Sequence, residues 1–375
     1  MENTAQLKTA IIHDWLTGMR GGEKVLEMII ELLPHADIYT LVHNMGTVSR
    51  LIEGRPIVTS FIDRLPFKKN HHAYYLPLFP TAIEMFDLKK YDFIFSTSHC
   101  VAKGIRTPPT AVHISYVHSP MRYVWDMYEE YFAPQRLNFF SRKIIPLWAN
   151  YLRMWDVTSS NRVDEFIANS QHVARRISKY YRRNAEVIYP PVDTSLYQIS
   201  KNTGDYFLIV SALVPYKRID LAIHACNKLK QPLVIIGEGP EKSFLKKIAG
   251  KTITFIGWQP AETLVNYYTE CIALLFPGEE DFGITPVEAQ ACGKPVIAYA
   301  RGGALETVIG YNGTNEQKCS GIFFREQSES SLAETLDIFN KLSWDREFIR
   351  NNSERFSEER FKSEISAFVK KILGF

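Results

Sequence analysis

Short apolar runs alternate with longer amphipathic stretches from one end of the chain to the other. Apolar residues at helical spacing predict helices, and short apolar runs between them predict strands. Strands that alternate with helices are typical of parallel sheets covered on both faces, so the pattern predicts an α/β protein. The predicted strands are 9–13, 37–42, 93–96, 112–117, 165–169, 207–210, 233–236, 253–255, 273–276 and 296–298, and the predicted helices include 23–33, 219–228, 242–249 and 261–271.

The chain has 375 residues, which is long for one core and predicts two domains. The division should fall within 189–205, where proline, glycine and polar residues gather before a new strand. We place the two domains at 1–198 and 199–353. The remaining segment, 354–375, contains a predicted amphipathic helix at 357–373.

Composition and charge argue against several classes of function. The formal net charge of +3 is small for a dedicated nucleic-acid binder. None of the five cysteines form a C-x-x-C pair, which speaks against a disulfide framework or a zinc site and favours the reducing cytosol. Residues 1–8 lack the apolar core of a signal peptide, and no run of about 18 apolar residues could span a membrane.

Candidate chemistry gathers in the segment that follows the predicted strand 273–276. A loop leads into a predicted helix, for which Thr285 is a suitable cap and Pro286 a suitable first residue. Gly283 allows the backbone to approach a ligand closely. A helix start at the carboxyl edge of a parallel sheet binds anions, so the segment predicts a phosphate site. The Glu280 carboxylate is placed to accept hydrogen bonds from sugar hydroxyls, and the Glu288 carboxylate is placed to accept them from the two hydroxyls of a ribose.

Two simpler interpretations of this segment stay open. Thr285-x-x-Glu288 fits a capping box, in which Glu288 only secures the start of the helix. The acidic run Glu279, Glu280 and Asp281 also fits a solvated loop.

The spacing Glu280-x7-Glu288, followed by Ala-Cys-Gly-Lys-Pro-Val296, resembles the signature of the family 4 retaining glycosyltransferases of GT-B fold. Further segments in the same order resemble landmarks of that family: 169–170, 189–193, 211–220, 236–240, 255–258 and 301–306. Segment 116–126 is similar to a subgroup associated with mannosyl transfer into bacterial polysaccharides.

The resemblance implies two Rossmann-like domains with parallel sheets that face each other across a cleft. Domain 1–198 would then lie on the acceptor side, and domain 199–353 would bind the nucleotide-sugar donor. The C-terminal helix, within 354–375, would return to the N-terminal domain.

The resemblance also implies roles for individual residues. The residues expected at the reacting sugar and diphosphate are Glu280, His118 and Lys217. The residues expected to bind the rest of the donor are Glu288 at the ribose; Phe282, Gly283, Ile284 and Thr285 at the sugar and phosphate; Gly21 and Gly22 near the phosphate; and Gly257, Trp258 and Gln259 at the base. Other histidines, His99 and His113, are interpreted as core or strand-end residues.

One position departs from the family. Ala212 stands where the family usually has an arginine, five residues before the lysine that matches Lys217. We include Arg218 as a candidate second cation for the diphosphate, because it is adjacent to Lys217.

The chain contains no Asp-x-Asp triplet, which many metal-dependent sugar transferases use. The resemblance therefore implies a metal-independent enzyme without a cofactor, whose substrate is a GDP- or UDP-hexose. Retention would follow from front-face substitution, in which the leaving phosphate helps to deprotonate the acceptor and the protein supplies positioning and charge stabilisation.

Basic residues are interleaved with aromatic residues in the N-terminal half, which suits either contact with anionic lipid or an ordinary solvated face. They are Lys68, Lys69, His71, His72, Tyr74, Tyr75, Arg136, Phe139, Phe140, Arg142, Lys143, Ile144, Trp148, Arg153, Arg175, Arg176, Lys179, Arg182 and Arg183. We expect a cytoplasmic protein that contacts the inner face of the plasma membrane peripherally.

The sequence thus predicts a retaining transferase that moves a hexose, with mannose from GDP-mannose as first candidate, onto a lipid-linked or polysaccharide glycan. Three alternatives stay open: the same fold with a UDP-sugar donor, a nucleotide-sugar epimerase, and a non-catalytic nucleotide- or glycan-binding subunit. A nicotinamide oxidoreductase is disfavoured because the chain has no G-x-G-x-x-G after its first strand.

Overall fold

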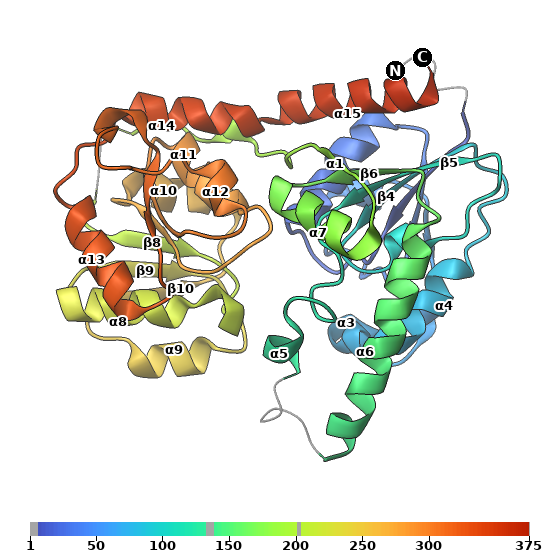
Figure 1. Ribbon diagram of the computed structural model, residues 1–375, viewed down its shortest axis with the longest axis horizontal. Coiled ribbons are helices and arrows are strands. Elements are labelled where there is room, and N and C mark those ends of the chain that lie inside the picture. Colours follow the sequence, from blue (N-terminus) through green and yellow to red (C-terminus); the bar gives the residue numbers. More distant parts are fainter. Residues whose placement is uncertain (1–6, 133–138, 201–203, 375) are drawn as a thin grey trace. The chain divides into compact units, whose positions relative to one another are not determined.

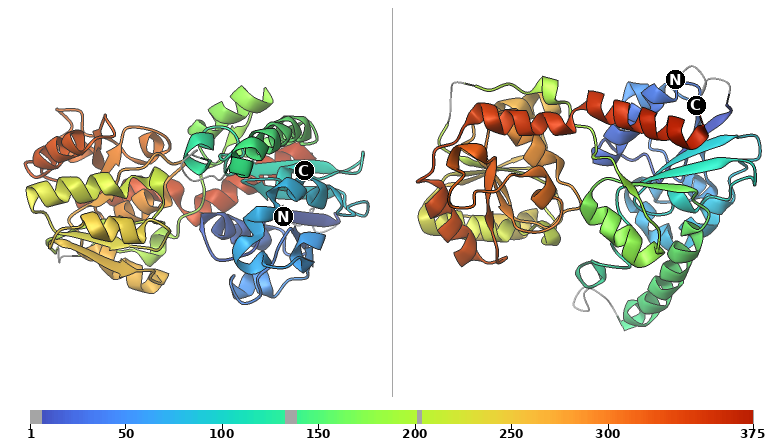
Figure 2. Two further views of the ribbon diagram at one scale, coloured as in Figure 1. Left: turned by 90° about the horizontal axis from the view of Figure 1, so that it is seen from below. Right: turned by 45° about the horizontal axis from the view of Figure 1, so that its top comes forward.

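The computed structural model describes residues 7–132, 139–200 and 204–374. The chain forms two compact units (Figure 1). Unit 1 comprises Met1–Pro191 and Phe361–Phe375, and unit 2 comprises Val192–Arg360. Figure 2 shows further views of both units.

Unit 1 is built on a seven-stranded parallel sheet in the order β3-β2-β1-β4-β5-β6-β7. The strands are β1 Thr9–His13, β2 Asp37–Thr40, β3 Ile57–Thr59, β4 Phe93–Ser98, β5 Val112–Val117, β6 Glu165–Ala168 and β7 Glu186–Val187. The α-helices are α1 Gly21–Leu32, α2 Arg50–Glu53, α3 Lys68–His71, α4 Phe79–Glu84, α5 Tyr128–Tyr131, α6 Phe139–Ser160, α7 Gln171–Tyr181 and α15 Glu358–Leu373, the last of which begins in unit 2.

Unit 2 is built on a six-stranded parallel sheet in the order β10-β9-β8-β11-β12-β13. The strands are β8 Phe207–Val210, β9 Leu233–Ile236, β10 Ile253–Gly257, β11 Leu274–Phe276, β12 Val296–Tyr299 and β13 Gly321–Phe324. The α-helices are α8 Ile219–Leu229, α9 Lys242–Ile248, α10 Ala261–Glu270, α11 Ile284–Ala291, α12 Ala304–Thr307, α13 Glu329–Phe339 and α14 Arg346–Ser353.

The predicted α/β class with parallel sheets is confirmed, and each predicted strand is present with ends that differ by at most a few residues. The sequence analysis missed β3, β7 and β13. Two of them, β3 and β7, are edge strands of three and two residues. Runs this short carry too few positions for a periodic signal.

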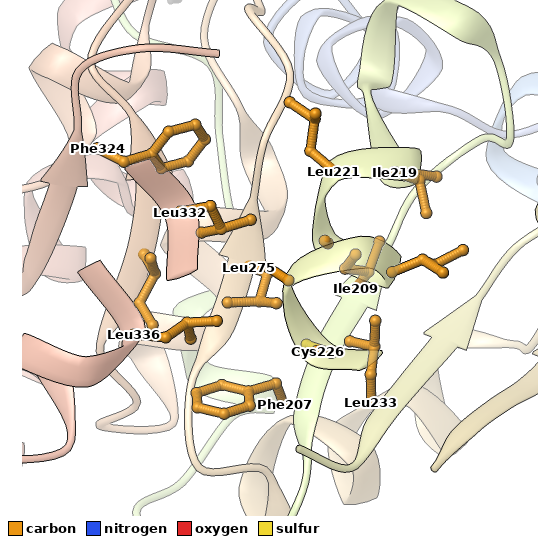
Figure 3. Close-up of a cluster of buried hydrophobic side chains, with 14 of the residues drawn as sticks. Phe207, Ile209, Ile219, Leu221, Cys226, Leu233, Leu275, Phe324, Leu332 and Leu336 are labelled. Carbon is orange, nitrogen blue, oxygen red and sulfur yellow. The ribbon is translucent and has the colours of Figure 1, made fainter. Parts of the chain in front are cut away.

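Side chains of successive strand residues point to opposite faces of each sheet, and both faces are buried. In unit 2, Ile209 and Leu275 lie on the face that α8 and α13 cover (Figure 3). Their neighbours Leu208 and Leu274 belong to a separate cluster on the other face, with residues of α10 and α11. Because both faces are apolar, the strands read as nearly continuous hydrophobic runs.

The C-terminal helix packs in unit 1, as predicted. Phe361, Ile365 and Val369 are buried in one cluster with Ile11 of β1 and Leu26 of α1. The three residues recur at four-residue spacing, which places them on one face of α15. The helix therefore completes the cover of one face of the unit 1 sheet.

The first division of the chain lies between Pro191 and Val192, a few residues before the predicted boundary at 198/199. The backbone N–H of Val192 donates to the carbonyl of Phe356 at 2.9 Å. Tyr197 is buried in the unit 2 cluster that contains Leu208. These contacts assign the segment after Pro191 to unit 2.

Replacing Phe361 by alanine should lower the free energy of unfolding of unit 1 by about 3–5 kcal/mol, because a fully buried aromatic ring is lost and a cavity remains. The matched control is Phe244→Ala, whose ring is half exposed on unit 2 and which should cost well under half as much. Urea unfolding of both variants is the measurement. Equal losses would mean that α15 is not part of the core of unit 1.

Candidate functional site

The strand order of unit 2 reverses between β8 and β11, which are neighbours at the centre of the sheet. Ligands of open parallel sheets bind beyond the carboxyl ends of the strands at such a switch point. The loops that leave β8 and β11 carry Lys217 and Glu280, two residues assigned to the site from sequence. A third loop, after β12, carries Gly302 and Gly303.

These three loops contact each other through their backbones. A Cβ atom at Gly278 would lie 2.9 Å from the Cα atom of Lys217, and one at Gly302 would lie 2.3 Å from the carbonyl oxygen of Glu280. The N–H of Gly303 donates to the same oxygen at 2.8 Å. Any side chain at these glycines would push the loops apart, so the glycines determine where Glu280 lies.

Lys217 and Glu280 form an ion pair between Nζ and Oε1. Their side chains are only 14% and 21% exposed. Partial burial weakens solvent screening, so the pair is stronger than one at the open surface. The structure thus brings together a cation and a carboxylate that lie far apart in sequence, at an edge where a phosphate and a hydroxyl-rich group could bind side by side.

Arg218 has its own partners at the start of α8. Its guanidinium contacts both carboxylate oxygens of Asp220 at 3.2 Å and donates to Gln327 at 3.3 Å. The role of Arg218 as a second cation for the diphosphate stays a prediction, and that role would require it to leave these partners.

Helix α11 begins at Ile284, and Gly283 precedes it with φ 89° and no side-chain cap. The prediction that Thr285 caps the helix and Pro286 opens it is therefore wrong. Gly283 adopts a left-handed conformation that turns the chain into the helix earlier, and a Cβ there would lie 2.9 Å from the Phe276 ring. Proline is still tolerated in the first turn, where its missing N–H would have no partner within the helix.

Glu288 is buried and accepts a hydrogen bond from the Tyr268 hydroxyl at 2.7 Å. Burial raises the pKa of Tyr268 well above its usual value, and the neighbouring charge of Glu288 adds to this effect, so Tyr268 stays a donor. The capping-box alternative for Glu288 is wrong, because Gly283 rather than Thr285 precedes the helix. Tyr268 of α10 instead orients this carboxylate.

The other donor-side predictions fall into two groups. Phe282 packs its ring against Phe356 with centroids 5.4 Å apart, which leaves its backbone as the part able to meet a ligand, next to Gly283, Ile284 and Thr285. Gly257, with φ 84°, ends β10, and the following Trp258 is 71% exposed beside Gln259. No contact in the structure tests their assignment to a nucleotide base.

Unit 1 has an equivalent edge. Its strand order reverses between β1 and β4, and Asp14, His99 and His118 directly follow β1, β4 and β5. Asp14 is fully buried and accepts four backbone N–H bonds of 2.7–2.9 Å from residues 99–102. Its Oδ2 atom also lies 3.2 Å from Nδ1 of His99. This carboxylate therefore holds the loop after β4 and orients the His99 ring.

His118 and His13 face the start of α1. A Cβ atom at Gly22 would lie 3.7 Å from Nε2 of His118 and 3.7 Å from Cε1 of His13, so Gly22 brings backbone close to both rings, and the role of the adjacent Gly21 stays a prediction. Burial, with repulsion from His99 and His13, lowers the pKa of His118 to about 3. His118 is therefore a neutral imidazole at physiological pH, with a buried Nε2 that has no hydrogen-bond partner within the described residues.

Glu23 lies in the first turn of α1. Burial alone would raise the pKa of the Glu23 carboxyl, but attraction to the nearby His13, whose Nε2 lies 3.8 Å from Oε1, together with His99 and a backbone N–H, lowers this pKa overall. Its carboxylate accepts from the backbone N–H of Arg20 at 3.0 Å. Glu23 thus places a negative charge among the three histidines.

Sequence reasoning missed His13, Asp14, Glu23 and His99 as members of this edge. His99 was interpreted as a core or strand-end residue, and it does follow the end of β4; the structure adds that it joins Asp14 and lies near His118, with ring centroids 6.3 Å apart. The interpretation of His113 as a core residue is confirmed by its full burial against Ser96. The sequence does hold a signal that could have identified two of these residues. Asp14 and His99 immediately follow strands, and therefore lie at the edge where parallel sheets bind ligands.

A cavity of about 830 Å³ lies elsewhere in unit 1. Residues that precede β4 and β5, including Leu88, Lys89, Arg106 and Pro108, line it. It therefore opens at the amino-end edge of the sheet, away from the histidines. Within residues 7–132, 139–200 and 204–374, no group of three His, Cys, Asp or Glu residues could hold a metal ion.

Two family descriptions match successive parts of the chain. Residues 19–196 match Glycosyltransferase Family 4, and residues 197–356 match Glycosyl transferases group 1. An uncharacterized glycosyltransferase of Methanocaldococcus jannaschii is 30% identical over 201 residues, which cover 49% of this chain and 56% of that protein. The O-antigen chain mannosyltransferase C of Escherichia coli is 27% identical over 180 residues, which cover 45% and 47%. The chain thus spans about half the length of these curated relatives.

Among solved structures, that of Anabaena HepE in complex with UDP and glucose superposes with a TM-score of 0.69. The match covers 97% of this chain and 100% of that chain at 17% sequence identity. At this identity the likeness shows a shared two-domain fold.

Replacing Gly283 by alanine should destabilise unit 2 more than the same change at Gly313. Both glycines have positive φ, which costs alanine about 1–2 kcal/mol, but only Gly283 has a neighbour, the Phe276 ring, within 4 Å of an added Cβ. The measurement is the free energy of unfolding of each variant in urea. Equal losses would show that the Phe276 ring does not constrain the turn before α11.

Acidification should destabilise unit 1. Burial lowers the pKa of His118 to about 3 and that of His113 to about 4, from 6.5. The unfolded chain binds these protons below pH 6.5 whereas the folded chain does not, so stability falls as pH drops from 7 to 5, by roughly 2 kcal/mol for each histidine.

Urea unfolding at both pH values tests this expectation. His118→Asn should remove part of the loss, and the exposed His35→Asn should leave it unchanged. An identical pH dependence in the wild type and in His118→Asn would contradict the expectation.

Proposed function

The chain belongs to family 4 of the glycosyltransferases, with the GT-B fold, and on that premise we propose that it transfers a hexose with retention to a lipid-linked or polysaccharide glycan. The first candidate donor is GDP-mannose. The observation that carries the proposal is the Lys217–Glu280 pair at the switch point of unit 2, beside the start of α11.

In this proposal the unit 2 site holds the donor. Lys217 and the free N–H groups at the start of α11 neutralise the diphosphate, whose charge grows as the glycosidic bond breaks. Glu280 accepts from hydroxyls of the sugar. Glu288, oriented by Tyr268, accepts from the ribose hydroxyls. When the donor binds, Lys217 and Glu280 would give up their contact with each other. Lys217 would then bind the diphosphate, and Glu280 would bind the sugar.

The histidines of unit 1 supply the remaining contacts. Neutral His118 offers Nε2 to the donor sugar without adding a positive charge that would repel a developing oxocarbenium ion. Gly21 and Gly22 let the diphosphate approach the start of α1. The proposal is of a metal-independent transfer, in which Lys217 and the start of α11 supply the positive potential at the diphosphate.

Support for the donor identity comes from two directions. The similarity to an O-antigen chain mannosyltransferase and to the mannosyl-transfer subgroup in residues 116–126 favours GDP-mannose. The shared fold with a protein crystallised with UDP and glucose supports a UDP-hexose as the second candidate. The base contacts proposed for Gly257, Trp258 and Gln259 do not discriminate between them.

An acceptor carried on lipid requires access to a membrane surface. No helix in the described part of the chain is long and apolar enough to cross a bilayer. We therefore propose peripheral contact at the inner face of the plasma membrane.

A thermal-shift screen of GDP, GDP-mannose, UDP and UDP-hexoses tests the donor assignment. A donor at about 100 times its Kd should stabilise the protein by about 2.7 kcal/mol, and GDP-mannose should act more strongly than UDP-sugars. If no nucleotide sugar raises the melting temperature, the donor site is wrongly assigned.

Lys217→Ala and Glu280→Gln should each lower kcat/KM by about 10²–10³, because each removes an interaction that strengthens in the transition state. Lys242→Ala, which removes a partly exposed lysine paired with Glu238, is the matched control and should be neutral. Steady-state transfer to a glycan acceptor is the measurement. Arg218→Ala in the same assay decides whether this residue supplies a second cation.

The anomeric configuration of the product, read by NMR, tests retention, and an inverted product would contradict it. The two remaining alternatives have distinct outcomes. An epimerase would alter the donor sugar without any acceptor, and a binding subunit would be stabilised by a nucleotide sugar without transferring it.

A further inference from the structure

Helix α6, Phe139–Ser160, has two unlike halves. Ala149 and Leu152 of its second half are buried in the unit 1 core. The first half is exposed around most of its surface. Figure 1 shows this amino-terminal end extending past the other helices of unit 1, and Figure 2 shows the same from another side.

The exposed half carries large apolar side chains that a solvated helix would not need. Phe139 is 67% exposed, Leu147 is 73% exposed and Trp148 is 43% exposed. Ile144, in the same turns, is 47% exposed. Exposed apolar residues gathered in this way mark a surface that contacts another apolar phase.

The charges of the exposed half have one sign. Arg142 and Lys143 are exposed, and the helix contains no acidic residue before Asp156. Apolar and cationic side chains on one helix are the pattern of helices that lie in the interface of an anionic bilayer.

The exposed half is anchored to the body of unit 1. The Trp148 ring lies edge-on to the Tyr151 ring, with centroids 6.1 Å apart. Tyr151 in turn packs against the core cluster that includes Leu152. Contacts between apolar side chains thus connect the exposed half of α6 to the core of unit 1.

Several of the other basic residues considered from sequence have partners within unit 1, whereas Arg175, Lys179 and Arg182 are exposed. Arg176 is paired with Asp126 and bonded to Ser119. Arg183 donates to the carbonyls of Val163 and Asp164. Of the other residues considered, Lys68 is paired with Asp63, Arg136 lies outside the described residues, and nothing is described for the side chains of Lys69 and Phe140.

We propose that the first half of α6, residues 139–148, is the membrane-docking surface of this protein and lies in the interface of an anionic bilayer. Ile144, Leu147 and Trp148 enter the acyl boundary, while Arg142 and Lys143 contact lipid phosphates. The inference rests on the proposed function only in that a lipid-linked acceptor gives the docking a purpose, and it assigns the membrane contact to one helix.

Flotation of the full chain with vesicles tests the surface directly, in the absence of donor and acceptor. Wild-type protein should bind vesicles of phosphatidylglycerol and phosphatidylcholine, and bind pure phosphatidylcholine vesicles at least several-fold more weakly. The double variant Leu147→Asp/Trp148→Asp should reduce binding to the anionic vesicles at least tenfold. Arg142→Ser/Lys143→Ser should reduce it several-fold and flatten its dependence on salt.

The control is Phe244→Asp, which places one such negative charge at an exposed apolar residue of unit 2 and should leave binding unchanged. Insertion has its own signal in Trp148. Brominated acyl chains should quench part of the wild-type fluorescence, and that part should be absent in Trp148→Phe. Thermal unfolding confirms that each variant is folded.

Vesicle binding that is absent in the wild type, or equal in Leu147→Asp/Trp148→Asp and the wild type, overturns the proposal. A wild-type dimer that becomes a monomer in that variant, without vesicle binding, would show that a second copy covers α6 and would also overturn it. Transfer to a soluble glycan should be unaffected by the α6 changes. A failed donor screen with intact vesicle binding would contradict the proposed function alone.

Discussion

The order of the parallel strands is the constraint on which both candidate edges depend. In each unit the connections that follow two adjacent central strands run in opposite directions. The two loops therefore separate at the carboxyl edge of the sheet and leave a crevice between them. The loops after β8 and β11 bring Lys217 to Glu280, and the loops after β1 and β4 bring Asp14 to His99. The chemistry of both edges therefore follows from the sheet order before any single side chain is considered.

Close backbone packing converts this general arrangement into defined positions. Gly278, Gly302 and Gly303 let three loops of unit 2 meet at distances that a side chain would prevent. In unit 1 the buried carboxylate of Asp14 performs the same task with four hydrogen bonds to a single loop. The unit 2 edge is thus shaped by the absence of side chains at three glycines, and the unit 1 edge by one charged group.

The electrostatics of the two units differ in a way that suits the proposed division of labour. Unit 2 presents a full ion pair that can separate to meet a charged donor. Unit 1 presents His118, which burial keeps neutral, together with the carboxylate of Glu23. A neutral imidazole together with a carboxylate tolerates a sugar that becomes positively charged during transfer, whereas a cationic group would oppose it.

The sequence by itself determined the α/β class and the central strands and pointed to the candidate site in segment 280–288, because continuous apolar runs and motif spacing are local properties of the chain. Tertiary structure decided the rest. Tyr268 rather than the helix start holds Glu288, Gly283 precedes α11 at the cap position where Thr285 was expected, and Asp14 brings His99 to the edge of unit 1. Each of these outcomes depends on a partner brought close by folding or on a backbone conformation that packing imposes. Such contacts between distant residues leave no periodic trace in the sequence, which is why only the folded chain shows them.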